Sequence, residues 1–285
     1  MSVLEDTSYD KPWVLFRLKN QTLGIPAHCT QELITVSSVT PVPRAPVYIK
    51  GVIDLRGSVI PLIDLRIILN QPSLEEDIDS FVELMQQRKE DHIRWVKELE
   101  KTATEGVPFT MERNPDKCKF GEWYNTYQPD NPRISGVLLK FNFPHRSVHA
   151  AADEVDKLLA QSKQQQAIDL VKQLEEKQMS QIVQLFDEMS HLVKSTHQAV
   201  AVVVEQDNIT FALTVDAVES VEPLGSIENL PGDMGEEHEY IISLLGRRKA
   251  NNEPVLIPDL ARIIKMQPGL AVLQKLPETE PMAEA

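Results

Sequence analysis

Hydrophobic residues are spaced in two different ways along the chain. Before about residue 70 and after about residue 198 they form short apolar runs typical of β-strands, as at 13–18, 59–65 and 200–204. Between about 73 and 196 they recur every three or four residues, which predicts helices. The prolines that divide this middle block into roughly four helices are Pro108, Pro115, Pro129, Pro132 and Pro144.

The two strand-rich segments resemble each other. Each has a hairpin with a polar turn, at 19–21 and at 206–208, followed by a long connection and two more strands that end in Asp-Leu, at Asp64 and Asp259. Because each half is too short to bury much core alone, we predict that the two pack together and that the helical block is an insertion. The alternative is three independent domains in a row.

The predicted boundaries follow from this division. The two halves of the β-domain span 11–72 and 198–267, the inserted helical domain spans 76–196, and 268–285 is predicted to be a flexible tail. An even number of helices would return the chain near its point of exit, as an insertion requires.

Composition and charge narrow the class of protein. The chain has 285 residues, of which 42% are hydrophobic and 25% charged, with a formal net charge of −14. No basic region suits a phosphate-rich partner, so we expect no nucleic acid partner. No apolar run approaches the ~20 residues that span a bilayer, and residues 1–10 do not resemble a signal peptide. We therefore expect a cytoplasmic protein with no direct membrane insertion.

Candidate metal ligands gather in the helical block. His145 and His149 are four residues apart after Pro144, so they share one face of a helix. Cys118 follows Asn114-Pro115-Asp116, which we interpret as a helix start, and His92 lies in the first predicted helix. One thiolate and three imidazoles form a tetrahedral donor set that suits Zn²⁺. Spacing alone leaves open that these side chains are solvated or packed in a core.

Other polar residues have simpler interpretations. Asp153, one turn after His149, either orients that imidazole or is an ordinary surface acid. Trp95 and Trp123 are expected to be core anchors. With two cysteines in the chain, a disulfide framework is not expected. The residues interpreted as packed or solvated are His28, Cys29, His191, His197 and His238.

A catalytic role is not expected. Four protein ligands fill a zinc site and leave no position for water, so such a site is structural or regulatory. The sequence contains no HExxH, GxSxG or P-loop string. A three-ligand site with Cys118 away from the metal would permit hydrolysis, and this zinc hydrolase is the less favoured alternative.

Two family resemblances add to this interpretation. The stretches WVLFRLKNQTLGIP and YIKGVIDLRGSVIPLIDLR, with VAVVVEQDNITFAL, EYIISLLGRR and VLIPDLARII later, resemble the CheW-like chemotaxis coupling domain. The strings HIRW, CKFGEWY and PHRSVH resemble the chemoreceptor zinc-binding (CZB) domain. The resemblance implies a multi-domain α and β fold, with a pair of five-stranded β-barrel subdomains around a shared core and an inserted four-helix bundle.

The resemblance also implies a function and its residues. The CheW-like family couples methyl-accepting chemoreceptors to a CheA-type histidine kinase and has no catalytic activity of its own. The ligands of the zinc-binding family correspond to His92, Cys118, His145 and His149, and its cysteine is associated with responses to zinc or to oxidants such as hypochlorous acid. A purely structural zinc ion is the alternative, and the family also allows a homodimer.

A turn in the first half carries the implied partner contact. Arg56 and Gly57 match a turn of the CheW-like family that is implicated in partner binding, and Asp54 is the third residue of this turn that we expect to contact a partner. Here the turn reads DLRG, with Asp54 where the family usually has Asn.

Overall fold

The computed structural model describes residues 11–129, 131–196, 199–230 and 241–266. The chain divides into two compact units, one formed by 1–74 with 198–285 and the other by 75–197. We call them the β-unit and the helical unit. The predicted tail at 268–285 and two of the histidines, His197 and His238, lie outside the described residues.

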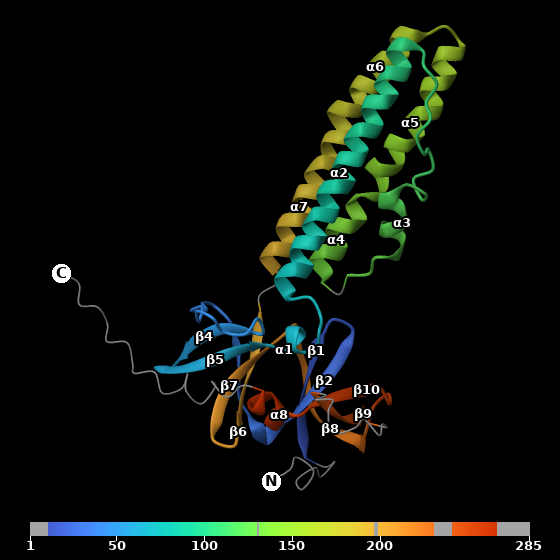
Figure 1. Cartoon of the computed structure of the whole chain (residues 1–285). Coiled ribbons are helices and arrows are strands. Elements are labelled where there is room, and N and C mark those ends of the chain that lie inside the picture. The colour runs from blue at the N-terminus through green and yellow to red at the C-terminus, as the bar shows by residue number, and fades with distance from the viewer. Residues whose placement is uncertain (1–10, 130, 197–198, 231–240, 267–285) are drawn as a thin grey trace, which may run out of the picture. The chain divides into compact units, whose positions relative to one another are not determined.

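The β-unit contains two five-stranded sheets (Figure 1). The first is closed, in the order β1 (Pro12–Leu18), β2 (Gln21–Pro26), β10 (Pro254–Pro258), β9 (Ile242–Arg248) and β8 (Ala217–Asn229), with β8 pairing back to β1. The second has the order β3 (Thr30–Thr35), β6 (Val200–Gln206), β7 (Ile209–Val215), β5 (Ser58–Asp64) and β4 (Ile49–Leu55). The prediction of two five-stranded sheets is confirmed.

Each sheet takes strands from both sides of the helical block. The hairpin β1–β2 joins β8, β9 and β10, whereas the hairpin β6–β7 joins β3, β4 and β5. The seams between the two halves include two parallel pairings, Leu23 with Leu256 and Leu62 with Ala212. The two halves are therefore interleaved strand by strand, a detail beyond the prediction that they pack together.

Burial on both faces explains the unbroken apolar runs of these strands. In β1, Trp13 and Leu15 pack in one cluster with residues of β8, β9 and β10. Phe16 and Leu18, on the same strand, pack in a second cluster that draws on strands of both sheets. A strand buried on both faces does not alternate between apolar and polar residues.

One bridge links the two edges of the second sheet. Beyond β3, Thr40 pairs with Val52 of β4, and each N–H donates to the other residue's carbonyl at 2.9 Å. Gly51 beside it has φ +145°, and a Cβ there would lie 2.3 Å from the Thr40 carbonyl oxygen. A glycine is therefore required for this approach. The first sheet is thus closed, whereas the second is an open five-stranded sheet in the described residues, with this isolated bridge at its β4 edge.

The helical unit has more segments than predicted. Its described residues form six α-helices rather than roughly four: α2 (Leu74–Glu105), α3 (Lys119–Thr126), α4 (Pro132–Lys140), α5 (Asn142–Ala160), α6 (Gln164–Leu174) and α7 (Ser180–Thr196). A π-helical turn at Glu175–Met179 joins α6 to α7 in one continuous rod. In Figure 1, α2 runs beside this rod, and an ion pair of 2.6 Å between Lys89 and Asp187 joins them.

The short helices complete the description. Helices α1 (Leu65–Ile68) and α8 (Leu260–Lys265) follow the two Asp-Leu motifs, and the side chains of Asp64 and Asp259 cap them. A 3₁₀ turn spans Ala27–Cys29. Within the described residues, no helix combines the length and the apolar character that crossing a membrane requires.

Candidate metal centre

His92 lies in the middle of α2 with its ring held by the helix itself. Its Nδ1 is 2.7 Å from the Arg88 carbonyl oxygen one turn earlier, which makes Nδ1 the protonated nitrogen. Nε2 is therefore the nitrogen with a free lone pair. It is buried and has no hydrogen-bond partner among the described residues. A buried lone pair without a partner is costly, and a metal ion would satisfy it.

His145 and His149 lie one turn apart in α5. As predicted, Pro144 falls in the first turn of this helix, and both imidazoles are buried. The two ring centroids are 4.8 Å apart, and each lies within 5.9 Å of the His92 ring centroid. Neither ring nitrogen of His149 has a partner of good hydrogen-bond geometry in the part of the chain that the structure describes, although the backbone of Glu112 and Arg113 is near enough to act on its pKa.

Cys118 is the N-cap of α3. Its Sγ accepts a hydrogen bond from the Gly121 N–H at 3.2 Å and lies 3.2 Å from Nε2 of His145. The predicted helix start at Asn114-Pro115-Asp116 is wrong, because the backbone there forms a turn that Asn114 closes with its side chain and its carbonyl. A Cβ on Gly121 would lie 1.8 Å from the Pro115 carbonyl oxygen, so this turn packs directly on the helix backbone.

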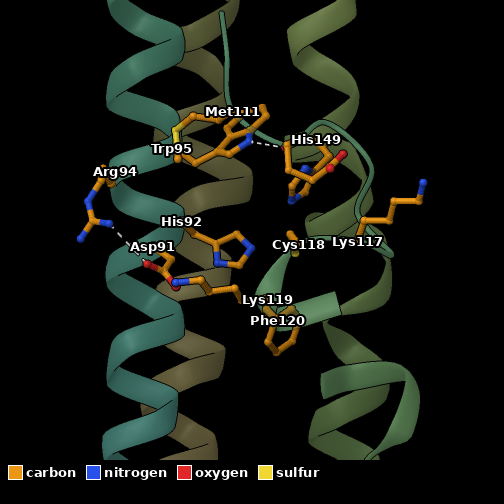
Figure 2. Close-up of a pocket in the computed structure, with 11 residues that line it drawn as sticks. Asp91, His92, Arg94, Trp95, Met111, Lys117, Cys118, Lys119, Phe120 and His149 are labelled. Carbon is orange, nitrogen blue, oxygen red and sulfur yellow. Dashed lines mark hydrogen bonds and ion pairs between the residues drawn. The ribbon is translucent and has the colours of Figure 1, made fainter. Parts of the chain in front are cut away.

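The four predicted donors converge. Taking one ligand atom from each of His92, Cys118, His145 and His149, all four atoms lie within 4.8 Å of one another. Figure 2 shows the side chains of His92, Cys118 and His149 directed toward a common point. Tetrahedral Zn²⁺ with bonds of about 2.0–2.3 Å separates its donor atoms by roughly 3.3–3.8 Å. The donor set and the unsatisfied nitrogens therefore fit such an ion.

Burial keeps the three imidazoles neutral. It lowers the pKa of His145 to about 3, and the neighbouring His92 and His149 add to the effect. Burial and the neighbouring His92 lower the pKa of His149 to about 4, against the opposite effect of the Arg113 and Glu112 backbone. Burial also lowers the pKa of His92. Neutral imidazole is the form that binds a metal, so the site is ready for one at neutral pH.

The Cys118 thiol is held differently. Burial raises its pKa, while the N–H groups of Gly121 and Phe120 act to lower it. A bound cation would reverse this balance, because a thiol that coordinates a metal is deprotonated.

A cavity of about 240 Å³ opens beside the cluster (Figure 2). Trp95, Met111 and Phe120 give it apolar walls, and the Cys118 side chain lines it together with two of the histidines. The predicted core anchor Trp95 is buried, lies 5.0 Å from the His149 ring centroid and donates from Nε1 to the Glu112 carbonyl oxygen at 2.8 Å. Sequence reasoning missed this second role of Trp95 beside the site.

Asp153 does not contact His149. Its carboxylate forms an ion pair of 2.8 Å with Arg113, and its side chain is 65% exposed. One turn beyond His149 on α5, it faces the segment that precedes α3 rather than the histidine rings. The observed orienting contact is instead the backbone carbonyl of Arg88 on His92. No sequence signal could have identified it, because every helical residue carries such a carbonyl.

The remaining predicted side chains stay apart from the cluster. Cys29 is buried in the β-unit core, His28 and His191 are exposed, and Trp123 stacks on Tyr127 at 4.6 Å. These positions agree with the interpretation of packed or solvated residues.

The predicted partner-binding turn is a tight two-residue hairpin loop between β4 and β5. Arg56 and Gly57 both have positive φ, +54° and +87°, as a type I′ turn requires. The Asp54 carboxylate accepts the Gly57 N–H at 2.8 Å, so Asp54 supports the turn. The Arg56 side chain is 81% exposed and forms an ion pair of 2.8 Å with Glu32.

Two family models match the chain. The CheW-like domain matches residues 12–96, and the chemoreceptor zinc-binding domain matches residues 92–155. All four donors lie in the second range, and residues 198–267 lie outside both.

Several curated relatives are chemotaxis proteins. The chain is 33% identical to the chemotaxis protein CheW of Klebsiella aerogenes, over 29% of this chain and 49% of that protein. It is 30% identical to the chemotaxis protein CheW of Thermotoga maritima, over 29% of this chain and 54% of that protein. The chain thus spans about half the length of these relatives. The solved scaffolding protein TtCheW of Thermoanaerobacter tengcongensis aligns over 96% of this chain and 98% of its own, with a TM-score of 0.37 and 14% identity, too low to bear on the fold.

Proposed function

We propose that this chain, which carries a CheW-like domain followed by a chemoreceptor zinc-binding domain, is a non-catalytic chemotaxis adaptor with a built-in zinc site. In this proposal the β-unit binds a CheA-type histidine kinase and a methyl-accepting chemoreceptor, and the helical unit binds one Zn²⁺. The proposal also includes the domain boundaries: the interleaved β-domain spans 11–72 and 198–267, and the inserted helical domain spans 76–196. The observation that carries it is the convergence of four donor atoms within 4.8 Å inside the range that the zinc-binding family matches.

The β4–β5 turn supports partner binding by the β-unit. An arginine in the left-handed region costs about 1 kcal/mol or more relative to glycine, and the fold does not need an arginine there. The ion pair with Glu32 is largely exposed, so it recovers little of this cost. A strained, exposed cation at a loop tip is suited to contact with a partner's carboxylate.

The helical unit would act through its four ligands. Three neutral imidazoles are fixed on two long helices, whereas Cys118 sits at the start of a short helix after an irregular segment. When bound, zinc would supply charge that keeps the Cys118 thiolate deprotonated. Cys118 is therefore the ligand that is most easily displaced and most easily oxidised.

Oxidation of Cys118 would open the site. Hypochlorous acid transfers its oxygen to the thiolate, which gives the sulfenic acid and releases chloride, so the sulfur is oxidised by two electrons and the chlorine reduced by two. A sulfenic acid is a poor ligand, which leaves the three histidines. His145 and His149 lie on α5, and the chain runs on through α6 and α7 to β6 of the β-unit. This covalent path is the route by which the loss of one ligand would bias partner binding.

Kinase binding in three states of the protein tests the sensing part. Affinity for a cognate CheA-type kinase is measured with zinc-loaded, chelator-stripped and oxidised full-length protein. We expect the oxidised and stripped forms to differ from the loaded form, Cys29→Ala to respond as the wild type does, and Cys118→Ala to ignore oxidant. Equal affinities in all states would contradict sensing and leave the adaptor role with a structural zinc.

Three further measurements address the alternatives. Chelation that melts the helical unit would favour a purely structural zinc, because a structural site supplies folding energy. X-ray absorption that shows a bound water in place of a protein ligand would favour the zinc hydrolase. Sedimentation with and without zinc tests the homodimer that the family resemblance allows.

A further inference from the structure

The segment 106–118, which connects α2 to α3 and delivers Cys118, is held at separate points along its length. We call it the cysteine segment. It has no helix or strand of its own among the described residues. From α2, the indole of Trp95 donates to the carbonyl oxygen of Glu112. Two ion-pair contacts run to α5, the helix that carries His145 and His149.

Arg113 bridges two carboxylates of α5. Its Nη1 donates to Oδ1 of Asp153 at 2.8 Å, and its Nη2 lies 2.7 Å from Oδ2 of Asp156. Because Asp153 and Asp156 are three residues apart, both lie on the same face of the helix. The guanidinium carbon is also 5.5 Å from the ring centroid of Phe109 in the cysteine segment, which restricts the arginine from the other side.

A second tie runs with the opposite polarity. Arg146 of α5, adjacent to His145, donates to Asp116 of the cysteine segment at 2.8 Å and to Asn142 at 3.0 Å. The segment thus carries a cation toward one end of α5 and an anion toward the other. This pattern fixes its register along the helix, because a displaced segment would lose both attractions.

Cys118 depends on this register. The Sγ to Nε2 distance of 3.2 Å joins a residue of the cysteine segment to a residue of α5. The N-cap bond to Gly121 fixes Cys118 relative to α3 but not relative to α5. Phe120 of α3 packs on α5, with its ring centroid 5.0 Å from that of His145. The ties between the cysteine segment and α5 act together with this contact to keep the sulfur facing the histidines.

We propose that Arg113, with Asp153 and Asp156, forms an ionic latch that positions Cys118 over the histidines and limits how readily the sulfur leaves them. This rests on the proposed metal site, and it assigns regulation of that site to positioning side chains that lie outside the donor set of His92, Cys118, His145 and His149. The latch is partly exposed, with 34% of the Arg113 side chain and 65% of the Asp153 side chain open to solvent, so salt weakens it. The buried ligand cluster is much less screened.

The test measures Cys118 reactivity in full-length Cys29→Ala protein. The rate of modification by a dithiodipyridine reagent is followed for zinc-loaded and metal-free samples. We expect Arg113→Gln, and Asp153→Asn combined with Asp156→Asn, to raise the rate about three- to tenfold, the size of effect that exposed ion pairs support. Arg113→Lys keeps the charge but loses the bridge to two carboxylates, so its modification rate should lie between those of the wild type and Arg113→Gln.

Matched controls come from the same helix. Lys157→Gln removes one positive charge, as Arg113→Gln does, and Glu154→Gln removes one negative charge, as a single aspartate substitution of the latch would. Each breaks an exposed ion pair of 2.7 Å that does not touch the cysteine segment. Both should leave the rate unchanged. Raising the salt from 0.1 to 1 M should increase the wild-type rate toward that of Arg113→Gln and leave Arg113→Gln itself nearly unchanged. This salt response distinguishes a latch from general loosening of the fold.

The outcomes separate the latch from the metal site. Equal rates for Arg113→Gln and the controls, in protein that binds zinc, would overturn the latch and leave the proposed function intact. If the wild-type protein binds no zinc, the proposed function is overturned. The latch is then still tested by the modification rates of the metal-free proteins, which report on the contact between Cys118 and His145.

Discussion

Gly121→Ala places one methyl group against the turn that carries Cys118. The new Cβ would lie 1.8 Å from the Pro115 carbonyl oxygen, 2.9 Å from its carbonyl carbon and 3.1 Å from Cα of Asp116. Ordinary contacts are about 3.5 Å or longer, so the backbones must separate by more than about 1.5 Å. The 3.2 Å hydrogen bond from the Gly121 N–H to Sγ of Cys118 does not survive that shift.

The expected drop in zinc affinity follows from the steric clash and the lost hydrogen bond. Overpacking typically costs about 1–3 kcal/mol, and the lost hydrogen bond adds about 1 kcal/mol. In the metal-free protein the turn can relax, whereas zinc binding requires the original position of Cys118. We therefore expect zinc affinity to fall by about 2–4 kcal/mol, or about 30- to 700-fold.

Competition against a chromophoric chelator measures this affinity. The matched control is Gly136→Ala in α4, where a Cβ meets no described atom within 4 Å. This control should bind zinc as the wild type does and gain up to about 1 kcal/mol of stability from helix propensity. Zinc affinity of Gly121→Ala within threefold of the wild type would refute the reasoning that Cys118 is a ligand held by this turn.

Three further predictions concern both units. In metal-free protein, the free energy of unfolding should fall as pH drops from about 6.5 to about 4, because the unfolded chain protonates its histidines first; the loss is up to about 1.4 kcal/mol per pH unit for each histidine that the fold keeps neutral. Urea titrations at several pH values measure this dependence, which should be flatter in the double variant His145→Gln with His149→Gln. An equal pH dependence in the two proteins would contradict this prediction. Gly51→Ala should lower the melting temperature of the β-unit and leave the zinc content unchanged, since the clash is confined to the second sheet. Arg56→Gly should keep or raise stability while kinase affinity drops, and undiminished binding would remove Arg56 from the partner site.

The pair His145 and His149 was predictable from local spacing, because a separation of four after Pro144 specifies one helix face. The assignment of His92 and Cys118 to the same site came from the family resemblance, because the 26-residue separation between them is not a local motif. The register of the segment before Cys118 was not predictable, because it depends on ion pairs between residues forty apart in sequence, such as Arg113 and Asp153. The same reason explains why spacing could not decide between a contact of Asp153 with His149 and an ordinary surface acid. Helix spacing gives the neighbours within a helix and says nothing of what packs across from it.

The β-unit was likewise predictable only in part. Strands and hairpins followed from apolar runs and polar turns, and the repeat indicated two related halves. The interleaving did not follow, because the parallel seams at Leu23–Leu256 and Leu62–Ala212 join segments separated by the whole insertion. Unbroken apolar strands are compatible with either arrangement.

Metal content combined with X-ray absorption at the zinc edge tests the central claim most directly. We predict one zinc ion per chain with three nitrogen ligands and one sulfur ligand in the wild type, and loss of the sulfur signal in Cys118→Ala. A wild-type spectrum without sulfur, or one that Cys118→Ala leaves unchanged, would contradict the site formed by His92, Cys118, His145 and His149.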